Sequence, residues 1–409
     1  MVRRPVAVAA ALLVAAPVAS AATAHALTGP APKRTPLTGA AEAAPSLLAR
    51  TAQQRRATPV RGWNVELGQA ATTRRGQLVR TARTFETLGV SWERGGDPVV
   101  EVRYRSNGVW SDWEDAHPLL GGGGKATEPL WVGPSRTVRV RVDTARPGLA
   151  LVLVDPGYQP SDEPAAFRQS GTTGSGTASG TTTTGTTTTA AVTTSTARTV
   201  TTAAAGPGVP MPNIRRRAEW GANPEWRGTD PVYSKTIRQA HVHHTAGSNR
   251  YGRADVPGII RGMYWYHTHQ LGWSDIGYNF LVDKFGKIWA GRAGGVMQPV
   301  RGAHTLGFNR NTVGVAAIGD YEKAVAGSKL TGALSRLTAW KLDLHRRNAV
   351  GRVRMLSEGS DRYPAGTWVR LPVIDGHRDT NETACPGANL YGKLPVVRQR
   401  AQQRIDTYR

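Results

Sequence analysis

Residues 237–247 read IRQAHVHHTAG and decide how the C-terminal half of this chain folds. Their first part, 237–243, is a strand candidate, and further candidates lie at 278–283, 287–290, 312–319 and 373–375. Helix candidates at about 254–270, 331–349 and 388–408 alternate with these strands. In the first helix Val256, Ile260, Met263 and His267 recur on one helical face. Strands that alternate with long helices predict an α/β domain with a mixed central sheet and flanking helices.

The only cysteine, Cys385, lies in residues 376–387, GHRDTNETACPG, eight residues after His377. A lone cysteine forms no disulfide within the chain, and its simplest interpretation is a small buried apolar side chain. Its place near a histidine favours another use, because thiolate and neutral imidazole are preferred zinc ligands. A catalytic zinc needs three protein ligands and one open position. The histidines at 241–244 offer the third ligand, so a zinc hydrolase is the first functional hypothesis.

Three histidines near the end of the 237–243 strand compete for the place of that third ligand. Adjacent side chains of a strand face opposite sides of the sheet, so His243 and His244 do not both point at one metal. His241 shares the strand face of His243 and is the main alternative on geometry alone. For His377, Asp375 or Asp379 is the expected hydrogen-bond partner.

The N-terminus has the order of a secretory signal peptide. Arg3 and Arg4 precede an apolar run at 5–19, and small residues follow up to the AHA sequence at 24–26. The run is too short to span a membrane. We therefore predict a secreted protein, extracellular or associated with the cell wall, with no membrane anchor after cleavage at residue 26.

The formal net charge is +23, or +21 once Arg3 and Arg4 leave with the predicted signal peptide. Such a charge favours acidic partners, and anionic cell-wall polymers are the ones an exported protein meets. The basic residues are scattered and no nucleic-acid-binding motif is present, so we expect no nucleic-acid partner.

The N-terminal half has the residue pattern of an all-β module. Residues 138–142, VRVRV, alternate as a half-buried strand does, and strand-like runs at 85–92, 99–104 and 149–154 are separated by turn residues. We predict a small sandwich-like module, with its tryptophans in the core rather than stacked on sugars. A stretch of Gly, Ser and Thr then forms a linker with nothing to bury.

This organisation predicts two independent cores, with the C-terminal domain able to fold and act alone. The predicted segments are a signal peptide at 1–26, a low-complexity linker at 27–61, the all-β module at 62–158, a Ser/Thr/Gly-rich linker at 159–212, and the domain that carries the chemistry at 213–409.

Within 213–409 a series of short motifs resembles, in order, the zinc N-acetylmuramoyl-L-alanine amidases related to peptidoglycan recognition proteins and phage amidases. The matching pieces are RAEWG at 217–221, VHHTA at 242–246, GWSDIGYNF at 272–280, GAH at 302–304, NRNTVG at 309–314, GHRD at 376–379 and CPG at 385–387. The segment between 291–292 and 302–304 is longer in this chain than in the family. Because of this difference, the resemblance does not predict which stem peptide is preferred.

The resemblance implies cleavage of the amide between N-acetylmuramic acid and L-alanine in peptidoglycan, with Zn²⁺ as cofactor and muropeptides as partners. It implies His243, His377 and Cys385 as zinc ligands, Tyr278 and Thr383 as catalytic residues, and His304, Thr305 and Asn309 as substrate contacts. Position 383 is Lys in phage enzymes and often Thr in active animal members. Two alternatives stay open: a non-catalytic peptidoglycan-binding protein, although such members typically lose the cysteine, and a zinc peptidase that cuts within the stem peptide.

Overall fold

A computed structural model describes residues 56–119, 125–162 and 208–409. The predicted signal peptide and most of both predicted linkers lie outside these residues. In the described part of the chain, no helix has the length and apolar character that crossing a membrane requires.

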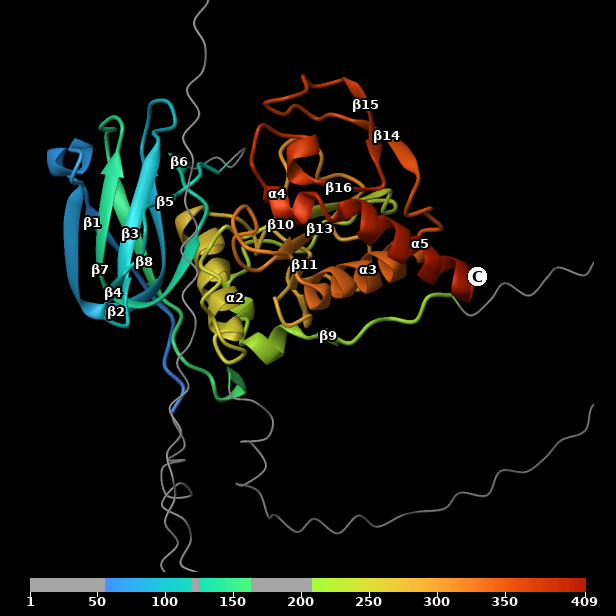
Figure 1. The fold of residues 1–409 in the computed structure, drawn as a ribbon, viewed down its shortest axis with the longest axis horizontal. Coiled ribbons are helices and arrows are strands. Elements are labelled where there is room, and N and C mark those ends of the chain that lie inside the picture. Colours follow the sequence, from blue (N-terminus) through green and yellow to red (C-terminus); the bar gives the residue numbers. More distant parts are fainter. Residues whose placement is uncertain (1–55, 120–124, 163–207) are drawn as a thin grey trace, which may run out of the picture. The chain divides into compact units, whose positions relative to one another are not determined.

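The N-terminal module is built from antiparallel strands, as predicted (Figure 1). They surround one apolar core. Its strands are β1 Arg61–Glu66, β2 Gln77–Trp92, β3 Val100–Ser106, β4 Val109–Trp110, β5 Glu114–Asp115, β6 Lys125–Ala126, β7 Leu130–Val142 and β8 Ala150–Asp155. Hydrogen bonds join them in the order β1-β8-β2-β7-β3-β4, with β5 beside β3 and β6 beside β2. Register shifts between Arg80 and Thr87 let the long strand β2 pair first with β7 and then also with β8.

The C-terminal domain contains a six-stranded mixed sheet, which confirms the predicted α/β fold class. Its order is β16-β10-β13-β11-β12-β9, from β9 Ile214–Arg215, β10 Gln239–His244, β11 Phe280–Val282, β12 Ile288–Ala290, β13 Thr312–Ala317 and β16 Ile374–Gly376. The helices are α2 Val256–Trp265 with the π-helical turn η6 Tyr266–Gln270, α3 Ser328–Asp343, α4 Ala388–Tyr391 and α5 Leu394–Tyr408. Strand β10 pairs in parallel with both β13 and β16.

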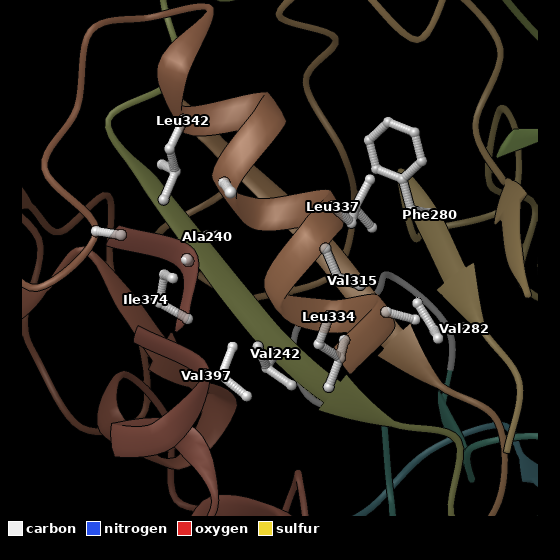
Figure 2. Close-up of a cluster of buried hydrophobic side chains, with 14 of the residues drawn as sticks. Ala240, Val242, Phe280, Val282, Val315, Leu334, Leu337, Leu342, Ile374 and Val397 are labelled. Carbon is white, nitrogen blue, oxygen red and sulfur yellow. The ribbon is translucent and has the colours of Figure 1, made fainter. Parts of the chain in front are cut away.

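The alternation of side chains along β10 sends its histidines to one side of the sheet. Ala240 and Val242 enter the core that α3 and α5 cover, where Figure 2 shows Val242 beside Leu334 of α3 and Val397 of α5. Because neighbouring side chains of a strand point to opposite faces, His241 and His243 face the other side. That side carries the second apolar cluster of the domain, which is built around α2.

Three details differ from the predicted elements. The last predicted helix is divided at Gly392 and Lys393 into α4 and α5. Helix α3 ends at Asp343, which leaves Leu344 exposed. A hairpin of β14 Arg352–Leu356 and β15 Trp368–Pro372 was not predicted, although its apolar and charged residues alternate in part.

Polar contacts join the N-terminal module to the C-terminal domain, against the prediction of two independent cores. Arg261 of α2 is almost fully buried, and its guanidinium donates two hydrogen bonds of 2.7 Å to Asp162, which follows the module at the start of the predicted 159–212 linker. The same side chain donates to the carbonyl oxygens of Pro156, Gly157 and Trp220. A buried, bidentate ion pair with its remaining donors satisfied is costly to break. The composition of the linker says nothing about such contacts, which explains the wrong prediction.

Close packing reinforces this boundary. Strand β8 turns Leu151 and Leu153 into the core of the module, while Val152 and Val154 pack with Tyr266 of the C-terminal domain. A Cβ atom on Gly89 of β2 would overlap the Tyr266 side chain, so the backbone of the module approaches that ring as only glycine allows. The two domains therefore share one packed boundary.

Candidate functional site

His243, His377 and Cys385 converge at one edge of the C-terminal sheet. Val242 of β10 is in register with Gly376 of β16, and the two strands run parallel, so His243 and His377 emerge side by side. Their ring centroids lie 4.6 Å apart. The Sγ atom of Cys385 lies 3.7 Å from Nδ1 of His243. One potential ligand atom from each of the three buried residues lies within 4.8 Å of the others, which is the arrangement a shared metal ion requires.

The chemistry of these side chains fits zinc. Burial lowers the pKa of His377 to about 3 and the pKa of His243 well below its usual value, so both imidazoles are neutral, as ligands must be. Burial also raises the pKa of the Cys385 thiol, and a coordinated metal would deprotonate it. Nε2 of His377 is buried and has no hydrogen-bond partner among the described residues. Two neutral imidazoles and one thiolate, with a position left open, match a catalytic zinc site.

The other two histidines of β10 have different partners. Nδ1 of His241 lies 2.7 Å from Oδ1 of Asp375, and both side chains are fully buried. Nδ1 of His244 accepts a hydrogen bond of 3.2 Å from the Tyr321 amide. His241, the alternative ligand, is thus committed to a carboxylate rather than to the cluster.

The expectation that Asp375 or Asp379 orients His377 is wrong. Asp375 stands opposite His241 in the β10–β16 register, while His377 lies beyond the end of β16. Oδ1 of Asp379 accepts a hydrogen bond of 2.7 Å from the Tyr391 hydroxyl. The amide of Asn381 donates a hydrogen bond of 3.1 Å to the carbonyl oxygen of His377, and the Asn381 side chain partly opposes the lowering of the His377 pKa by burial.

His304, predicted as a substrate contact, lies against a candidate metal ligand. Its Nδ1 is 3.1 Å from Nε2 of His243. Cβ atoms on Gly302 or Gly314 would overlap the imidazole of His304, which explains glycine at both positions. His304 therefore fixes the ring orientation of His243, as a hydrogen-bonded neighbour of a metal ligand does.

Thr305 and Asn309 hold the loop that carries His304. Oδ1 of Asn309 accepts hydrogen bonds from the amides of His304, at 2.8 Å, and Thr305, at 3.1 Å. The hydroxyl of Thr305 donates to Oδ1 of Asn381 at 2.9 Å. Through Asn381 this loop is connected to His377, so both residues support the cluster as well as bordering the cavity described next.

A cavity of about 90 Å³ opens beside the cluster. Its lining contains Leu119, Glu128, His267, Trp273, Tyr278, Ala303, His304, Thr305, Leu306, Asn309 and His377. Tyr278 is buried, with its ring centroid 5.3 Å from that of His243. Burial, together with the charges of Glu128 and Cys385, raises the pKa of the Tyr278 phenol, which therefore remains a hydrogen-bond donor.

Thr383 lies beside the cluster but not among the residues that line the cavity. Its Oγ1 accepts a hydrogen bond of 3.2 Å from the amide of Cys385. The residue thus shapes the turn before Cys385, and its side chain is half-buried.

Sequence reasoning missed the two ionisable residues of the cavity lining that lie outside the predicted site, His267 and Glu128. His267 was expected to pack, but it lines the cavity. Its Nε2 has no hydrogen-bond partner in the described chain, while its Nδ1 accepts a hydrogen bond from the Gly277 amide at 3.2 Å. The π-helical turn η6, which a 3.6-residue period does not reveal, carries it there. Glu128 comes from the N-terminal module, where no motif pointed to chemistry.

Comparison with known proteins gives family matches for both halves of the chain. Residues 233–388 match the family model described as N-acetylmuramoyl-L-alanine amidase. Residues 33–204 match a model described as Rv3811 N-terminal galactose-binding domain-like.

Individual relatives match the C-terminal half. The chain is 30% identical over 179 residues to peptidoglycan-recognition protein SC1a of Drosophila melanogaster, covering 44% of this chain and 82% of that protein. It is 28% identical over 182 residues to peptidoglycan-recognition protein SC2 of Drosophila simulans, covering 44% and 84%. It is 34% identical over 187 residues to an N-acetylmuramoyl-L-alanine amidase of Homo sapiens, covering 45% of this chain and 28% of the human protein.

Proposed function

This chain belongs to the family of peptidoglycan-recognition proteins and N-acetylmuramoyl-L-alanine amidases, and we propose that it is a secreted, zinc-dependent member that cleaves peptidoglycan. The bond cut is the amide between the lactyl group of N-acetylmuramic acid and L-alanine. Soluble muropeptides and the intact wall are its substrates. The signal-like order of residues 1–26 supports export.

The observation that carries the catalytic proposal is the complete set of ligand side chains at the cavity. A protein that only binds peptidoglycan has no need of a buried thiol 3.7 Å from one imidazole and near a second. Zinc held by His243, His377 and Cys385 would polarise the scissile carbonyl and lower the pKa of a water molecule toward neutrality.

The remaining chemistry belongs to side chains of this protein. Tyr278, kept protonated by burial, donates a hydrogen bond to the oxyanion that develops on the substrate carbonyl. His304 holds the ring of His243 in orientation through their 3.1 Å contact. Thr305 and Asn309 line the cavity where the muropeptide enters, and Thr383 contributes more weakly from the turn beside Cys385.

The test is digestion of a defined muropeptide by the chain from residue 27 onward, with products read by mass spectrometry. We expect separation of the sugar from a stem peptide with a free L-alanine amino group. Chelation should abolish the reaction and added zinc should restore it.

Each alternative predicts a different result. Fragments cut between stem residues would identify a peptidase. Binding of the muropeptide without any product, in a zinc-loaded chain, would identify a recognition protein and refute the proposal.

A further inference from the structure

Among the described residues, Glu128 is the only carboxylate in the lining of the cavity, and it comes from the N-terminal module rather than from the domain that carries the candidate metal ligands. It lies in the short segment between β6 and β7. Glu128 lines the same cavity as Tyr278 and His377, and its charge raises the pKa of both Tyr278 and Cys385.

Contacts on both sides of Glu128 hold it at the cavity. The Tyr266 hydroxyl donates a hydrogen bond of 3.1 Å to the carbonyl oxygen of Thr127. The Ser248 amide donates one of 2.9 Å to the carbonyl oxygen of Trp131, whose ring packs edge-on against Tyr251 at 6.0 Å. Tyr266 directly precedes His267 of the cavity lining, so the two domains are fixed to each other at this point.

The backbone of Glu128 is also fixed within its own module. Its amide donates a hydrogen bond of 2.8 Å to the carbonyl oxygen of His117. The hydroxyl of the preceding Thr127 accepts a 3.0 Å hydrogen bond from the Val90 amide in β2. The sheet of the module and its docking therefore hold the backbone of Glu128 at the cavity that this residue lines.

The Glu128 carboxylate takes no part in holding the described structure together. Within the described residues it makes no hydrogen bond or ion pair, unlike Asp162 and Asp375, which are tied to Arg261 and His241. A carboxylate held at the wall of a cavity without a partner is costly unless a ligand or a proton completes it. Burial raises the pKa of Glu128 to about 7, in keeping with a group that exchanges a proton near neutral pH.

We propose that Glu128 is a catalytic residue, the general acid–base of the hydrolysis, supplied to the active site by the N-terminal module. This inference rests on the proposed amidase function. The Glu128 carboxylate takes a proton from the attacking water as the water oxygen bonds to the carbonyl carbon. It then passes that proton to the amide nitrogen as the carbon–nitrogen bond breaks. Water is the only co-reactant, and the products are the lactyl carboxylate and the free amino group of L-alanine.

The experiment compares Glu128→Gln with the wild-type chain on a soluble muropeptide, with kcat and KM measured separately and zinc content checked. We expect kcat to fall about 100-fold or more, because general acid–base catalysis contributes about 10²–10⁴-fold. KM and zinc content should change little. Glu66→Gln is the matched control, since Glu66 is an exposed carboxylate of the same module and should keep wild-type turnover.

A second variant separates a chemical role from a packing role. In Glu128→Ala, added formate should restore part of the turnover, because a small carboxylate can occupy the vacated space and carry the proton. Glu128→Gln with kcat within a few fold of wild type, or no formate rescue of Glu128→Ala, would overturn the role of Glu128 and leave the amidase function intact. A wild-type chain that makes no product would instead refute the amidase function, and the role of Glu128 with it.

Discussion

The cluster of candidate metal ligands and the cavity wall around Glu128 differ in how they are assembled. The cluster of His243, His377 and Cys385 is built inside one domain, at the ends of two neighbouring parallel strands. The wall around Glu128 is built by docking a second domain, through contacts such as the 3.1 Å hydrogen bond from Tyr266 to Thr127. The first depends on local motifs and the second on a boundary between distant segments. Substitutions in the two regions should therefore have different effects. A change in the cluster should remove the metal, whereas a change at the wall around Glu128 should reduce catalysis and leave the metal bound.

The largest effect is expected from Cys385→Ser, which attacks the cluster itself. Serine is a poor zinc ligand at neutral pH, so zinc affinity should fall by more than the roughly 10–100-fold cost of losing a neighbour of a ligand. Turnover should fall with it. Metal analysis after dialysis checks this, and full zinc occupancy in the variant would remove Cys385 from the ligand set.

Next in size is Tyr278→Phe, which keeps the ring and removes the hydroxyl. Loss of one oxyanion donor costs about 10²–10³-fold in kcat. Zinc content should equal that of the wild type, because Tyr278 is not among the candidate ligands. Near-normal turnover with metal bound would make Tyr278 a structural residue.

Gly89→Val tests the cavity wall around Glu128. Its side chain would strike Tyr266 at the domain boundary, and overpacking of this kind costs about 1–3 kcal/mol. We expect reduced turnover, because Glu128 moves away from the cavity, with zinc content unchanged. Gly68→Ala is the control, since a Cβ there meets nothing within 4 Å. Loss of zinc in Gly89→Val would show that the cluster of candidate metal ligands depends on the wall around Glu128.

The same boundary should respond to pH through Glu86 of β2. Burial, with Asp255 and Asp155 nearby, raises the pKa of Glu86 from 4.5 to about 7, and the neighbouring Trp131 and Arg261 only partly oppose this shift. Because the folded form holds this proton more tightly, stability should fall as pH rises from about 4.5 to 7 and then level off. Thermal unfolding across that range should show a smaller decline in Glu86→Gln than in wild type. An identical decline in both would exclude Glu86.

The smallest effect is expected from Thr383→Ala. Thr383 lies outside the cavity lining, and its hydroxyl accepts only the Cys385 amide. Turnover should fall only a few fold, about the loss of one neutral hydrogen bond of roughly 1 kcal/mol. A loss as large as that of Tyr278→Phe would give Thr383 a direct part in the reaction.

The sequence was most informative where side-chain chemistry and strand position coincide. The histidines of β10 and the stretch after β16 could be interpreted because parallel strands end at a common edge, and the alternation along β10 separates His243 from His244. The mixed sheet and its helices followed from periodicity. The pairing of His241 with Asp375 could not be predicted, since it depends on the register between two strands far apart in the chain.

The contribution of the N-terminal module was beyond any local pattern. Glu128 has no motif around it, and Arg261 looks like an ordinary helix residue until Asp162 is seen beside it. In the sequence, Gly89 looks like a residue that weakens a strand. In the structure, it lets the Tyr266 side chain approach the backbone of β2. Contacts between domains depend on such small residues, and no sequence motif marks them.

The glycine-lined boundary limits how this protein can be recombined. Gly62 lies against Trp265 and Gly89 against Tyr266, so each small residue of the module fits one large residue of the other domain. A chimera that grafts the module onto a related protein of the family, or exchanges it for another all-β domain, must transfer both members of each pair. Otherwise the graft will be covalently attached but misaligned. The two halves therefore fit each other as a matched pair rather than as interchangeable parts.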